Sequence, residues 1–319
     1  MAERTLRIGT RASALALWQA NRVAALIRAL PGAPPVELVH IRTEGDMRTD
    51  VPLWAVDGRA FFTKEIDRAL LANEIDVAVH SLKDLTTTLD TGIELSAILE
   101  RQDPRDALLV RTGATTLADL PAGARVGTSS LRRRAFLARR RPDIVAMELR
   151  GNVPTRIEKL ERGEYDAIIL ASAGLARLGL EKHITARLPV EDFTPAVSQG
   201  AIGCCARAGD TEAARWMMPL DNEAARLETT AERALLRRIE GGCQVPLGAL
   251  ARLTHGKVRL YSAVCALDGS KHVTATGTAE PNLAAAAALG ERLAEELLEQ
   301  GAARIIAVER GGRRTVEAP

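Results

Sequence analysis

Aromatic residues are scarce in this sequence. Trp, Tyr and Phe together make up 3% of the 319 residues, and they form no stacking motif of the kind that binds unpaired bases. Arginine is concentrated in the run LRRRAFLARRR, whose guanidinium groups would suit phosphates, but the formal net charge of the chain is only +2. We therefore do not expect a nucleic-acid-binding protein.

Cysteine is also rare, and long hydrophobic runs are missing. The four cysteines include no CxxC pair and are too few for a disulfide framework in a chain of this size, so we expect reduced thiols. Arginines interrupt the N-terminal apolar segment, unlike a signal peptide, and no run approaches the length of a membrane span. These absences predict a cytoplasmic protein without a membrane partner.

Motifs for common cofactors and metals are missing as well. No GxGxxG follows the first predicted strand and no Walker sequence occurs, which excludes the usual dinucleotide and nucleoside triphosphate sites. His80 has no second histidine or cysteine at the spacing of metal ligands. We expect His80 to order the end of a strand, and we predict no metal site.

Short apolar runs alternate with amphipathic stretches up to about residue 200, which is typical of α/β sheets. Strands are predicted at residues 5–9, 36–42, 75–80, 93–98, 107–111, 124–127, 144–149 and 166–171. Helices are predicted at residues 12–30, 61–73, 130–141 and 153–162. This order predicts parallel sheets covered by helices. Beyond Leu220 a helix at 223–238, strands at 247–253, 258–267 and 272–278, and a helix at 283–300 predict a small α+β domain.

Small and polar residues directly follow several of these strands, where ligands bind in α/β sheets. In GTSSLRRR, two interpretations stand. Thr128 or Ser129 caps a helix while the arginines lie in solvent, or the segment binds a carboxylate or phosphate through main-chain donors, the helix N-terminus and guanidinium groups. Further arginines at equivalent positions, which favour a ligand with several carboxylates, are Arg11, Arg150, Arg156 and Arg177.

The segment HSLKDL places Lys83 and Asp84 just past an apolar strand. An aspartate there can stabilise a developing cation or exchange a proton; alternatively the two residues form a surface pair that contributes little. The segment RQDPRD, at residues 101–106, is better explained as a self-paired hinge than as a catalytic group.

Cys243 lies in a glycine-containing loop, EGGCQVP. Gly241 and Gly242 remove side chains beside the cysteine and allow unusual backbone conformations, and Pro246 stiffens the exit. One interpretation is a small buried hydrophobic side chain, which is common for an isolated cysteine. The other is a thiol presented to a reactant.

Eight motifs, taken in order and spacing, resemble the porphobilinogen deaminase (hydroxymethylbilane synthase) family over nearly the whole chain. They are TRASALALWQA, HSLKDL, RQDPRDA, GTSSLRRR, RGNVPTR, EYDAIILASAGLARLG, PAVSQGAIG and AERALLRRIEGGCQVP. The resemblance implies a cytoplasmic, monomeric transferase of haem and other tetrapyrrole (porphyrin) biosynthesis. Such an enzyme joins porphobilinogen molecules head to tail with loss of ammonia and releases hydroxymethylbilane by hydrolysis.

The resemblance also implies a dipyrromethane cofactor, held by a thioether at Cys243 and used as the primer of the chain. Its other contacts would be Ser81, Lys83, Asp84, Thr128, Ser129, Ser130, Arg132, Arg133, Arg150 and Arg156. The residues implied for the substrate are Arg11, Gln19, Arg150, Arg156, Ala171, Arg177 and Gln199. Those implied for catalysis are Asp84, Arg11 and Lys83, with Asp84 stabilising the azafulvenium cation. Each pyrrole carries acetate and propionate arms, which would explain the arginines.

The implied fold is α/β, with two lobes like those of type II periplasmic binding proteins and a C-terminal α+β domain. The domains would be residues 1–99 with 200–219, which carry the aspartate loop, residues 100–199, which carry the arginines, and residues 220–319, which carry the cysteine. Because the lobes resemble binding proteins, the alternative is a two-lobed binding protein or sensor domain for a small polycarboxylate, without turnover.

The sequence departs from the family pattern at a few positions. Trp54 and Ala60 stand in the segment that forms a mobile lid in the family, and Thr86 replaces a proline after the Lys–Asp pair. Ser198 replaces the first glycine of a Gly-Gln-Gly turn. These changes bear on lid motion and rate rather than on the reaction class, since the cysteine, aspartate and arginines are present.

Overall fold

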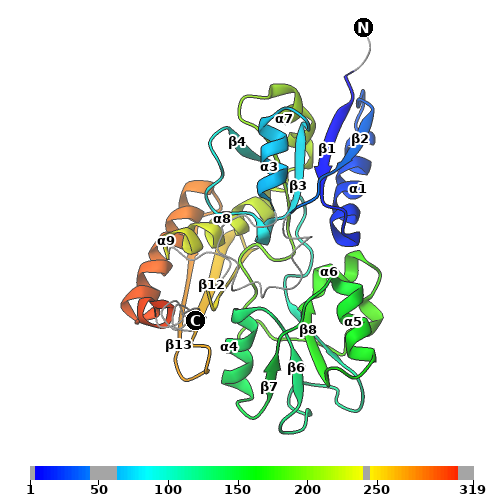
Figure 1. Ribbon diagram of the computed structural model, residues 1–319. Coiled ribbons are helices and arrows are strands. Elements are labelled where there is room, and N and C mark those ends of the chain that lie inside the picture. The colour runs from blue at the N-terminus through cyan, green and yellow to red at the C-terminus, as the bar shows by residue number, and fades with distance from the viewer. Residues whose placement is uncertain (1–3, 44–62, 240–244, 308–319) are drawn as a thin grey trace, which may run out of the picture. The chain divides into compact units, whose positions relative to one another are not determined.

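The computed structural model describes residues 4–43, 63–239 and 245–307, and the chain divides into two compact units (Figure 1). Unit 1 contains the described residues 4–43, 63–102 and 200–226, and unit 2 contains residues 103–199, 227–239 and 245–307. The predicted α/β class with two sheet-containing lobes and a C-terminal α+β domain is confirmed. The predicted division into three domains stays a prediction.

Unit 1 is built on a five-stranded sheet with the order β2-β1-β3-β10-β4. Its strands are β1 (Leu6–Thr10), β2 (Val36–His40), β3 (Val77–Ser81), β4 (Ile93–Ile98) and β10 (Ile202–Arg207). Its helices are α1 (Ala14–Arg28), α3 (Lys64–Leu71) and α7 (Thr211–Met217), with 3₁₀ turns η2 (Leu82–Asp84) and η4 (Met218–Leu220). Ser13 caps α1, because its hydroxyl accepts a hydrogen bond from the amide of Ala16 (3.3 Å).

Helices cover both faces of this sheet, because its strands alternate their buried side chains between the two faces. Val79 and Cys204 pack with residues of α1 and α7 in one hydrophobic cluster. Ala78 and Cys205 pack with α3 in another. Cys204, Cys205 and Cys265 are buried free thiols, as predicted.

The prediction of parallel sheets is confirmed only in part. In unit 1, β1 is parallel to β2 and β3, but β10 lies between β3 and β4 and is antiparallel to both. The chain enters β10 at the edge where β3 ends, since Ile202 pairs with Ser81, and it therefore runs back along β3. The sequence prediction missed β10, although the family resemblance returned this segment to the N-terminal lobe.

Unit 2 contains a second five-stranded sheet with the order β7-β6-β8-β5-β9. Its strands are β5 (Asp106–Val110), β6 (Arg125–Gly127), β7 (Val145–Met147), β8 (Ala167–Ala171) and β9 (Ala186–Arg187). Helices α4 (Leu131–Arg140), α5 (Val153–Glu161) and α6 (Ser172–Arg177) follow β6, β7 and β8, and η3 (Glu181–His183) precedes β9. β5 is antiparallel to β8 and β9, so this sheet is mixed as well.

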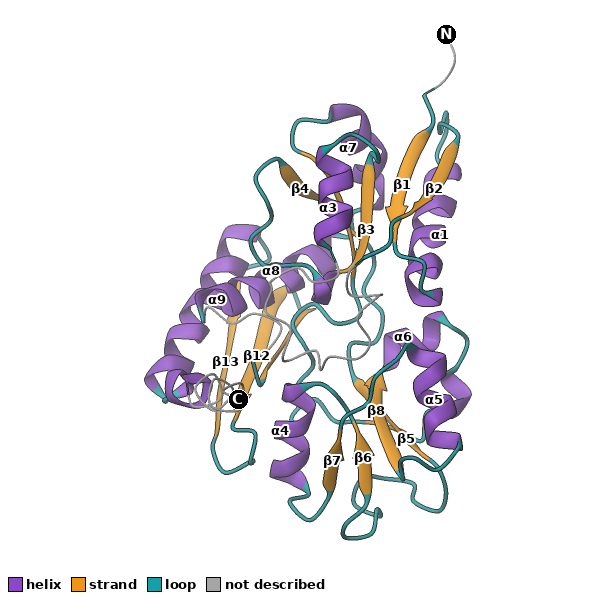
Figure 2. Cartoon of the chain, viewed as in Figure 1, coloured by secondary structure: helices purple, strands orange, loops and turns teal. Residues whose placement is uncertain are grey.

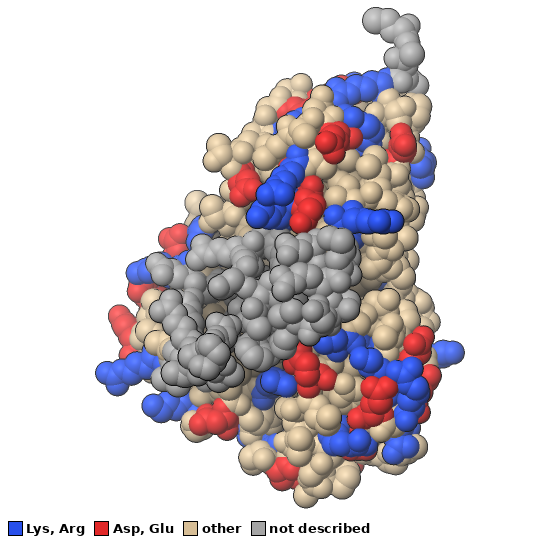
Figure 3. All heavy atoms as spheres, in the orientation of Figure 1, with Lys and Arg blue, Asp and Glu red and all other residues tan. Residues whose placement is uncertain are grey.

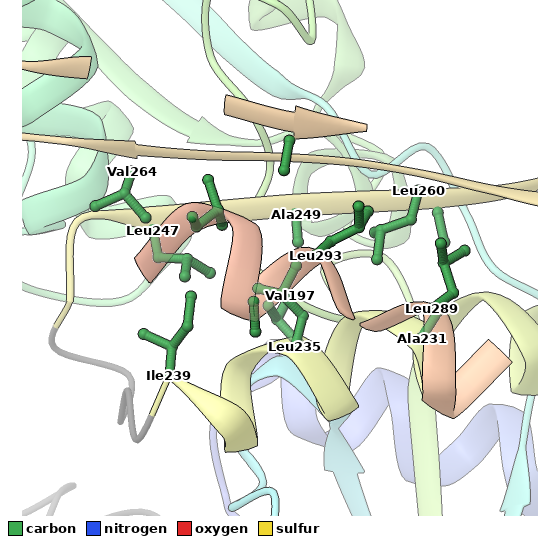
Figure 4. Close-up of a cluster of buried hydrophobic side chains, with 14 of the residues drawn as sticks. Val197, Ala231, Leu235, Ile239, Leu247, Ala249, Leu260, Val264, Leu289 and Leu293 are labelled. Carbon is green, nitrogen blue, oxygen red and sulfur yellow. The ribbon is translucent and has the colours of Figure 1, made fainter. Parts of the chain in front are cut away.

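Unit 2 also contains the antiparallel strands β11 (Leu247–Thr254), β12 (Lys257–Cys265) and β13 (His272–Ala279) with helices α8 (Glu223–Arg238) and α9 (Leu283–Glu299) (Figure 2). The first residues of α8 belong to unit 1. Gly290 lets α9 approach α8 closely, because a Cβ atom there would lie 2.2 Å from the carbonyl oxygen of Ala231. In the resulting core, Val197 packs among Leu235, Leu247 and Leu293 (Figure 4).

Val197 leads into a strained turn. Ser198 has φ +62°, in the left-handed region that favours glycine. Its amide donates to Oε2 of Glu232 (2.6 Å), and Glu232 Oε1 accepts from the amide of Ala251 (2.7 Å), so α8 holds both the turn and β11. The Ser198 side chain is fully buried, and Oγ has no hydrogen-bond partner in the described part of the chain.

No helix within the described ranges is long and apolar enough to cross a membrane.

We expect the substitution Ser198→Gly to raise the free energy of unfolding by about 1 kcal/mol. It removes the left-handed strain of a residue with a Cβ atom and an unsatisfied buried hydroxyl, and these gains exceed the added entropy of glycine in the unfolded chain. Ser198→Ala is the matched control, because it removes the hydroxyl and keeps the strain. Urea denaturation should rank glycine above alanine; an alanine variant as stable as the glycine variant would contradict the strain.

Candidate functional site

The unit 1 site residues lie at one edge of its sheet. β3 ends at Ser81, and η2 then carries Lys83 and Asp84. Arg11 directly follows β1, the parallel neighbour of β3, so these residues come from the same edge. Arg11, Lys83 and Asp84 are all half-buried.

Gln19 and Ser81, both predicted as ligand contacts, touch each other. Gln19 is buried on α1, and its Nε2 donates a hydrogen bond to Oγ of Ser81 (2.8 Å). This bond fixes the last residue of β3 directly before Lys83 and Asp84. The structure therefore connects α1 to the segment with the predicted catalytic aspartate.

In unit 2, the loops after β6 and β7 are connected by side chains that the sequence singled out. Ser129 Oγ donates to the carbonyl of Leu149 (2.6 Å) and accepts from the Leu149 amide (3.2 Å). Ser130 caps α4 by accepting a hydrogen bond from the amide of Arg133 (3.4 Å). The interpretation that Thr128 or Ser129 supplies this cap is wrong, because Ser130 stands at the cap position.

Arg132 and Arg133 converge on one carboxylate, that of Asp106. Arg132 donates to both Asp106 oxygens (2.7 and 3.2 Å) and to the carbonyl of Thr194 (2.7 Å). Arg133 Nε and Nη2 donate to Asp106 Oδ1 (3.1 and 2.8 Å), and Nη1 donates to the carbonyl of Ile169 (2.9 Å). Nε2 of Gln199 also donates to Asp106 Oδ1 (2.9 Å). These donors hold a carboxylate that solvent does not reach.

The electrostatics of this network favour a charged aspartate. Burial alone would raise the pKa of Asp106, but the charges and hydrogen bonds of Arg132 and Arg133 hold it well below its ordinary value. The interpretation that the arginines lie in solvent is wrong for Arg132 and Arg133, which are 4% and 6% exposed. Whether they also contact a cofactor stays a prediction.

The segment RQDPRD is confirmed as self-paired, but only in part. Arg105 donates to both carboxylate oxygens of Asp103 at 2.7–3.1 Å, near the surface. Asp106, in the same motif, is instead buried and accepts hydrogen bonds from Arg132 and Arg133 of α4. Sequence reasoning missed this role, although Asp106 is an acidic residue at the start of an apolar strand, where a buried charge requires partners.

A group of guanidinium groups lies beside this network. Burial and the positive charges of Arg133 and Arg150 together lower the pKa of Arg156 to about 10, with Glu148 as a partial counter-charge. The Nε of Arg156 donates to the carbonyl of Gly151 (2.7 Å) at the N-terminus of α5. Crowded cations next to a positive helix end are stabilised by a bound anion. The group formed by Arg133, Arg150 and Arg156 is hereafter the arginine group.

The other predicted residues of unit 2 also have defined positions. Ala171 ends β8 and pairs across the sheet with Asp106. Arg177 is buried on α6, and burial lowers its pKa to about 10. Gln199 additionally donates to the carbonyl of Pro104 (2.7 Å). Ala171 thus borders the Asp106 network, and Gln199 belongs to it.

Some predicted residues fall outside the described part of the chain. They are Cys243, Trp54 and Ala60. Thr86 is described, and its hydroxyl donates to the carbonyl of Thr88 (2.6 Å), which closes a local turn without a proline.

Comparison with known proteins identifies the family. Residues 6–215 match the family model described as "Porphobilinogen deaminase, dipyromethane cofactor binding domain", and residues 226–299 match "Porphobilinogen deaminase, C-terminal domain". The chain belongs to the porphobilinogen deaminase family. It is 47% identical over 306 residues to a protein of Syntrophobacter fumaroxidans named porphobilinogen deaminase, and the match covers 96% of this chain and 98% of that protein.

Solved structures outside the porphobilinogen deaminase family show weaker similarity. A methionine-binding protein is 12% identical, with a TM-score of 0.44, and the match covers 68% of this chain and 89% of that one. A nutrient-binding protein from Burkholderia cenocepacia is 14% identical, with a TM-score of 0.43, and the match covers 66% of this chain and 89% of that one. Similarity at this level has no bearing on activity.

We expect Asp106→Asn to lower the free energy of unfolding by about 3 kcal/mol or more, because two buried guanidinium groups lose their counter-charge. Asp103→Asn in the same motif is the matched control, and its effect should stay below about 1 kcal/mol, since its ion pairs with Arg105 and Arg187 lie at the surface, where solvent reaches both partners. Chemical denaturation of both variants measures the difference. Equal effects would show that the Asp106 network is not the stabilising feature.

We expect Arg156→Gln to weaken porphobilinogen binding by about 10-fold or more, because a charged hydrogen bond to a carboxylate is lost. Stability should not fall, since the substitution relieves repulsion within the arginine group. Arg162→Gln, at the other end of α5, is the control, because Arg162 pairs with Glu164 at the surface. Calorimetric titration that finds the same affinity in both variants would argue against anion binding at Arg156.

Proposed function

We propose that this chain is a hydroxymethylbilane synthase. Its substrate is porphobilinogen, which it joins head to tail with loss of ammonia until the linear product is released by hydrolysis. The observation that carries this proposal is the family match over residues 6–215 and 226–299. The arginine group supports it, since it suits a substrate with several carboxylates. The alternative of a two-lobed binding protein rests on weak fold similarity alone.

We propose Cys243 as the attachment point of the dipyrromethane cofactor. The thiolate is the nucleophilic form of cysteine, and burial opposes it in the other thiols. Burial raises the pKa of Cys204 well above its ordinary range and that of Cys265 to about 11, and Cys205 is also fully buried. These properties make the three described cysteines poor attachment sites and favour the one in the glycine-containing loop.

The residues of this chain fit such a cofactor. Its acetate and propionate arms require guanidinium and main-chain donors. The arginine group supplies the guanidinium donors, and the N-terminus of α5 beside it supplies the main-chain donors. When bound, the dipyrromethane supplies the primer to which substrate pyrroles are joined. We propose that Ser81, Lys83, Asp84, Thr128, Ser129, Ser130, Arg132, Arg133, Arg150 and Arg156 hold it.

We propose Asp84 as the principal catalytic residue. Its carboxylate would accept hydrogen bonds from a pyrrole N–H, stabilise the cation left when porphobilinogen loses ammonia, and move protons during that loss. The cations of Arg11 and Lys83, from the same sheet edge, would bind substrate carboxylates. Arg150 and Arg156 would then serve both cofactor and substrate.

Further substrate contacts belong to the same proposal. We propose that Gln19 orients Ser81, and that Arg177 adds a cation for a substrate carboxylate. Ala171 and Gln199 would fix the backbone around Asp106 and thereby the direction of the Arg132 and Arg133 side chains.

The remaining proposals concern the setting of the enzyme. We propose a cytoplasmic monomer of haem and tetrapyrrole biosynthesis, with porphobilinogen as its small-molecule partner and no nucleic-acid partner. Positive and negative side chains are interspersed over the face drawn in Figure 3, rather than gathered in one basic patch. We also propose the three-domain division at residues 1–99 with 200–219, 100–199 and 220–319.

The purified protein should carry a dipyrrole adduct on the peptide that contains Cys243. Mass spectrometry of the intact chain and of its peptides measures the adduct, and Cys204, Cys205 and Cys265 serve as internal controls that should be unmodified. Cys243→Ser should lack the added mass and lose synthesis of hydroxymethylbilane. An unmodified Cys243 in an actively turning over preparation would contradict the proposal.

Asp84→Asn should fold normally and lower the rate of porphobilinogen consumption by about 100-fold or more, because the developing cation loses its counter-charge. Asp84→Glu keeps the charge and should retain more activity than Asp84→Asn. Steady-state assays of both variants test this ranking, and turnover of the asparagine variant close to that of the parent protein would remove Asp84 from its role.

A further inference from the structure

Unit 1 contains a buried acid–imidazole pair that the proposed chemistry does not use. Asp67 on α3 and His80 on β3 are 8% and 5% exposed, and Asp67 Oδ1 lies 3.9 Å from His80 Nε2. Neither atom has a hydrogen-bond partner among the residues that the structure describes. Buried polar atoms in folded proteins are nearly always paired, so two such atoms facing each other indicate an interaction.

His80 lies directly before the predicted catalytic segment, so the Asp67–His80 pair bears on the position of that segment. His80 precedes Ser81, and η2 with Lys83 and Asp84 follows at once. On the other side of β3, Gly203 of β10 pairs with His80, and the amide of Leu82 donates to the carbonyl of Ala201 (3.0 Å). The imidazole is thus a buried side chain at the point where the strand turns into the predicted catalytic segment.

Charged groups face the pair from several elements. Burial, together with the positive charge of Arg11 after β1, lowers the pKa of His80 to about 4. The pKa of Asp67 is raised to about 6, mainly by burial; the Thr63 hydroxyl opposes this increase, and the charges of Asp90 and Glu65 contribute to it. At neutral pH the imidazole is therefore neutral and the carboxylate ionised, which allows one ring N–H to point at one acceptor.

We propose that Asp67 and His80 are positioning residues, in which the Asp67 carboxylate accepts a hydrogen bond from Nε2–H of His80, fixes its tautomer, and so holds Ser81–Asp84 in place. A side-chain movement of about 1 Å closes the present separation to hydrogen-bond length. The effect on turnover rests on the proposed function of the chain, whereas the pairing itself does not.

The pairing is tested by NMR of the imidazole nitrogens, which distinguishes the two tautomers. The chain has five histidines, so each ring can be assigned by substitution. In the parent protein at pH 7, His80 should be neutral with its proton on Nε2. In Asp67→Ala, the acceptor for Nε2–H is removed, so the Nε2–H population should fall in favour of Nδ1–H.

His183 provides a matched control. Its Nδ1 lies 3.7 Å from Glu161 Oε1, but both side chains are solvent-accessible. Glu161→Gln should leave the tautomer ratio of His183 and the turnover of the enzyme unchanged. His80→Gln is the second variant if Asp67→Ala does not fold, because its amide keeps a donor near Asp67.

Kinetics test the positioning. In Asp67→Ala, kcat for porphobilinogen should fall about 10-fold with KM within about 2-fold, because misplacement of a catalytic segment affects the transition state most. The kcat–pH profile should also lose a component near pH 6 that belongs to Asp67. His80→Gln should show the same pattern with a smaller loss.

The outcomes separate this proposal from the proposed function. An unchanged His80 tautomer in Asp67→Ala overturns the pairing, whether or not the parent consumes porphobilinogen. A changed tautomer with parental kcat and pH profile overturns the positioning. A parent with no turnover contradicts the proposed function, and the NMR result then still decides the pairing.

Discussion

Asp106 is a buried carboxylate on which the arrangement of unit 2 depends. It accepts hydrogen bonds from Arg132, Arg133 and Gln199, and Arg132 continues to the carbonyl of Thr194. Gly248 of β11 leaves room at that carbonyl, because a Cβ atom there would lie 2.3 Å from the Thr194 oxygen. One carboxylate therefore connects α4 of the α/β lobe to a segment that packs on β11. A buried charge of this kind costs stability unless every donor is in place, and it consequently specifies one geometry.

The ion pairs of Asp106 also distinguish two sets of arginines in this lobe. Arg132 and Arg133 are directed inward by Asp106, while the positive charges of Arg133 and Arg150 repel that of Arg156. An anion with several carboxylates would relieve the resulting repulsion. In unit 1, the corresponding organisation comes from Gln19 and the Asp67–His80 pair, which order β3 just before Lys83 and Asp84. Buried contacts thus lie next to the predicted site residues in both units.

The sequence predicted the elements with regular patterns. The strand at 93–98 and the helix at 223–238 have the predicted bounds, because apolar periodicity and turn residues define them locally. It missed β10, whose place between β3 and β4 depends on pairing with distant strands. The motif RQDPRD predicts a hinge, and its one sign of a buried acceptor is the place of Asp106 at the start of an apolar strand; the partners come from α4, which is distant in the sequence. The contact of Gln19 with Ser81 became clear only when α1 was placed on the sheet.

The central claim is that Asp106 stays ionised inside the protein because Arg132 and Arg133 neutralise it. Carbon-13 NMR of the Asp106 carboxyl group, followed from pH 7 to the lowest pH at which the chain stays folded, tests this claim most directly. We predict the chemical shift of a carboxylate throughout. A titration of the folded protein with a midpoint near the ordinary aspartate value of about 3.9 would contradict the account.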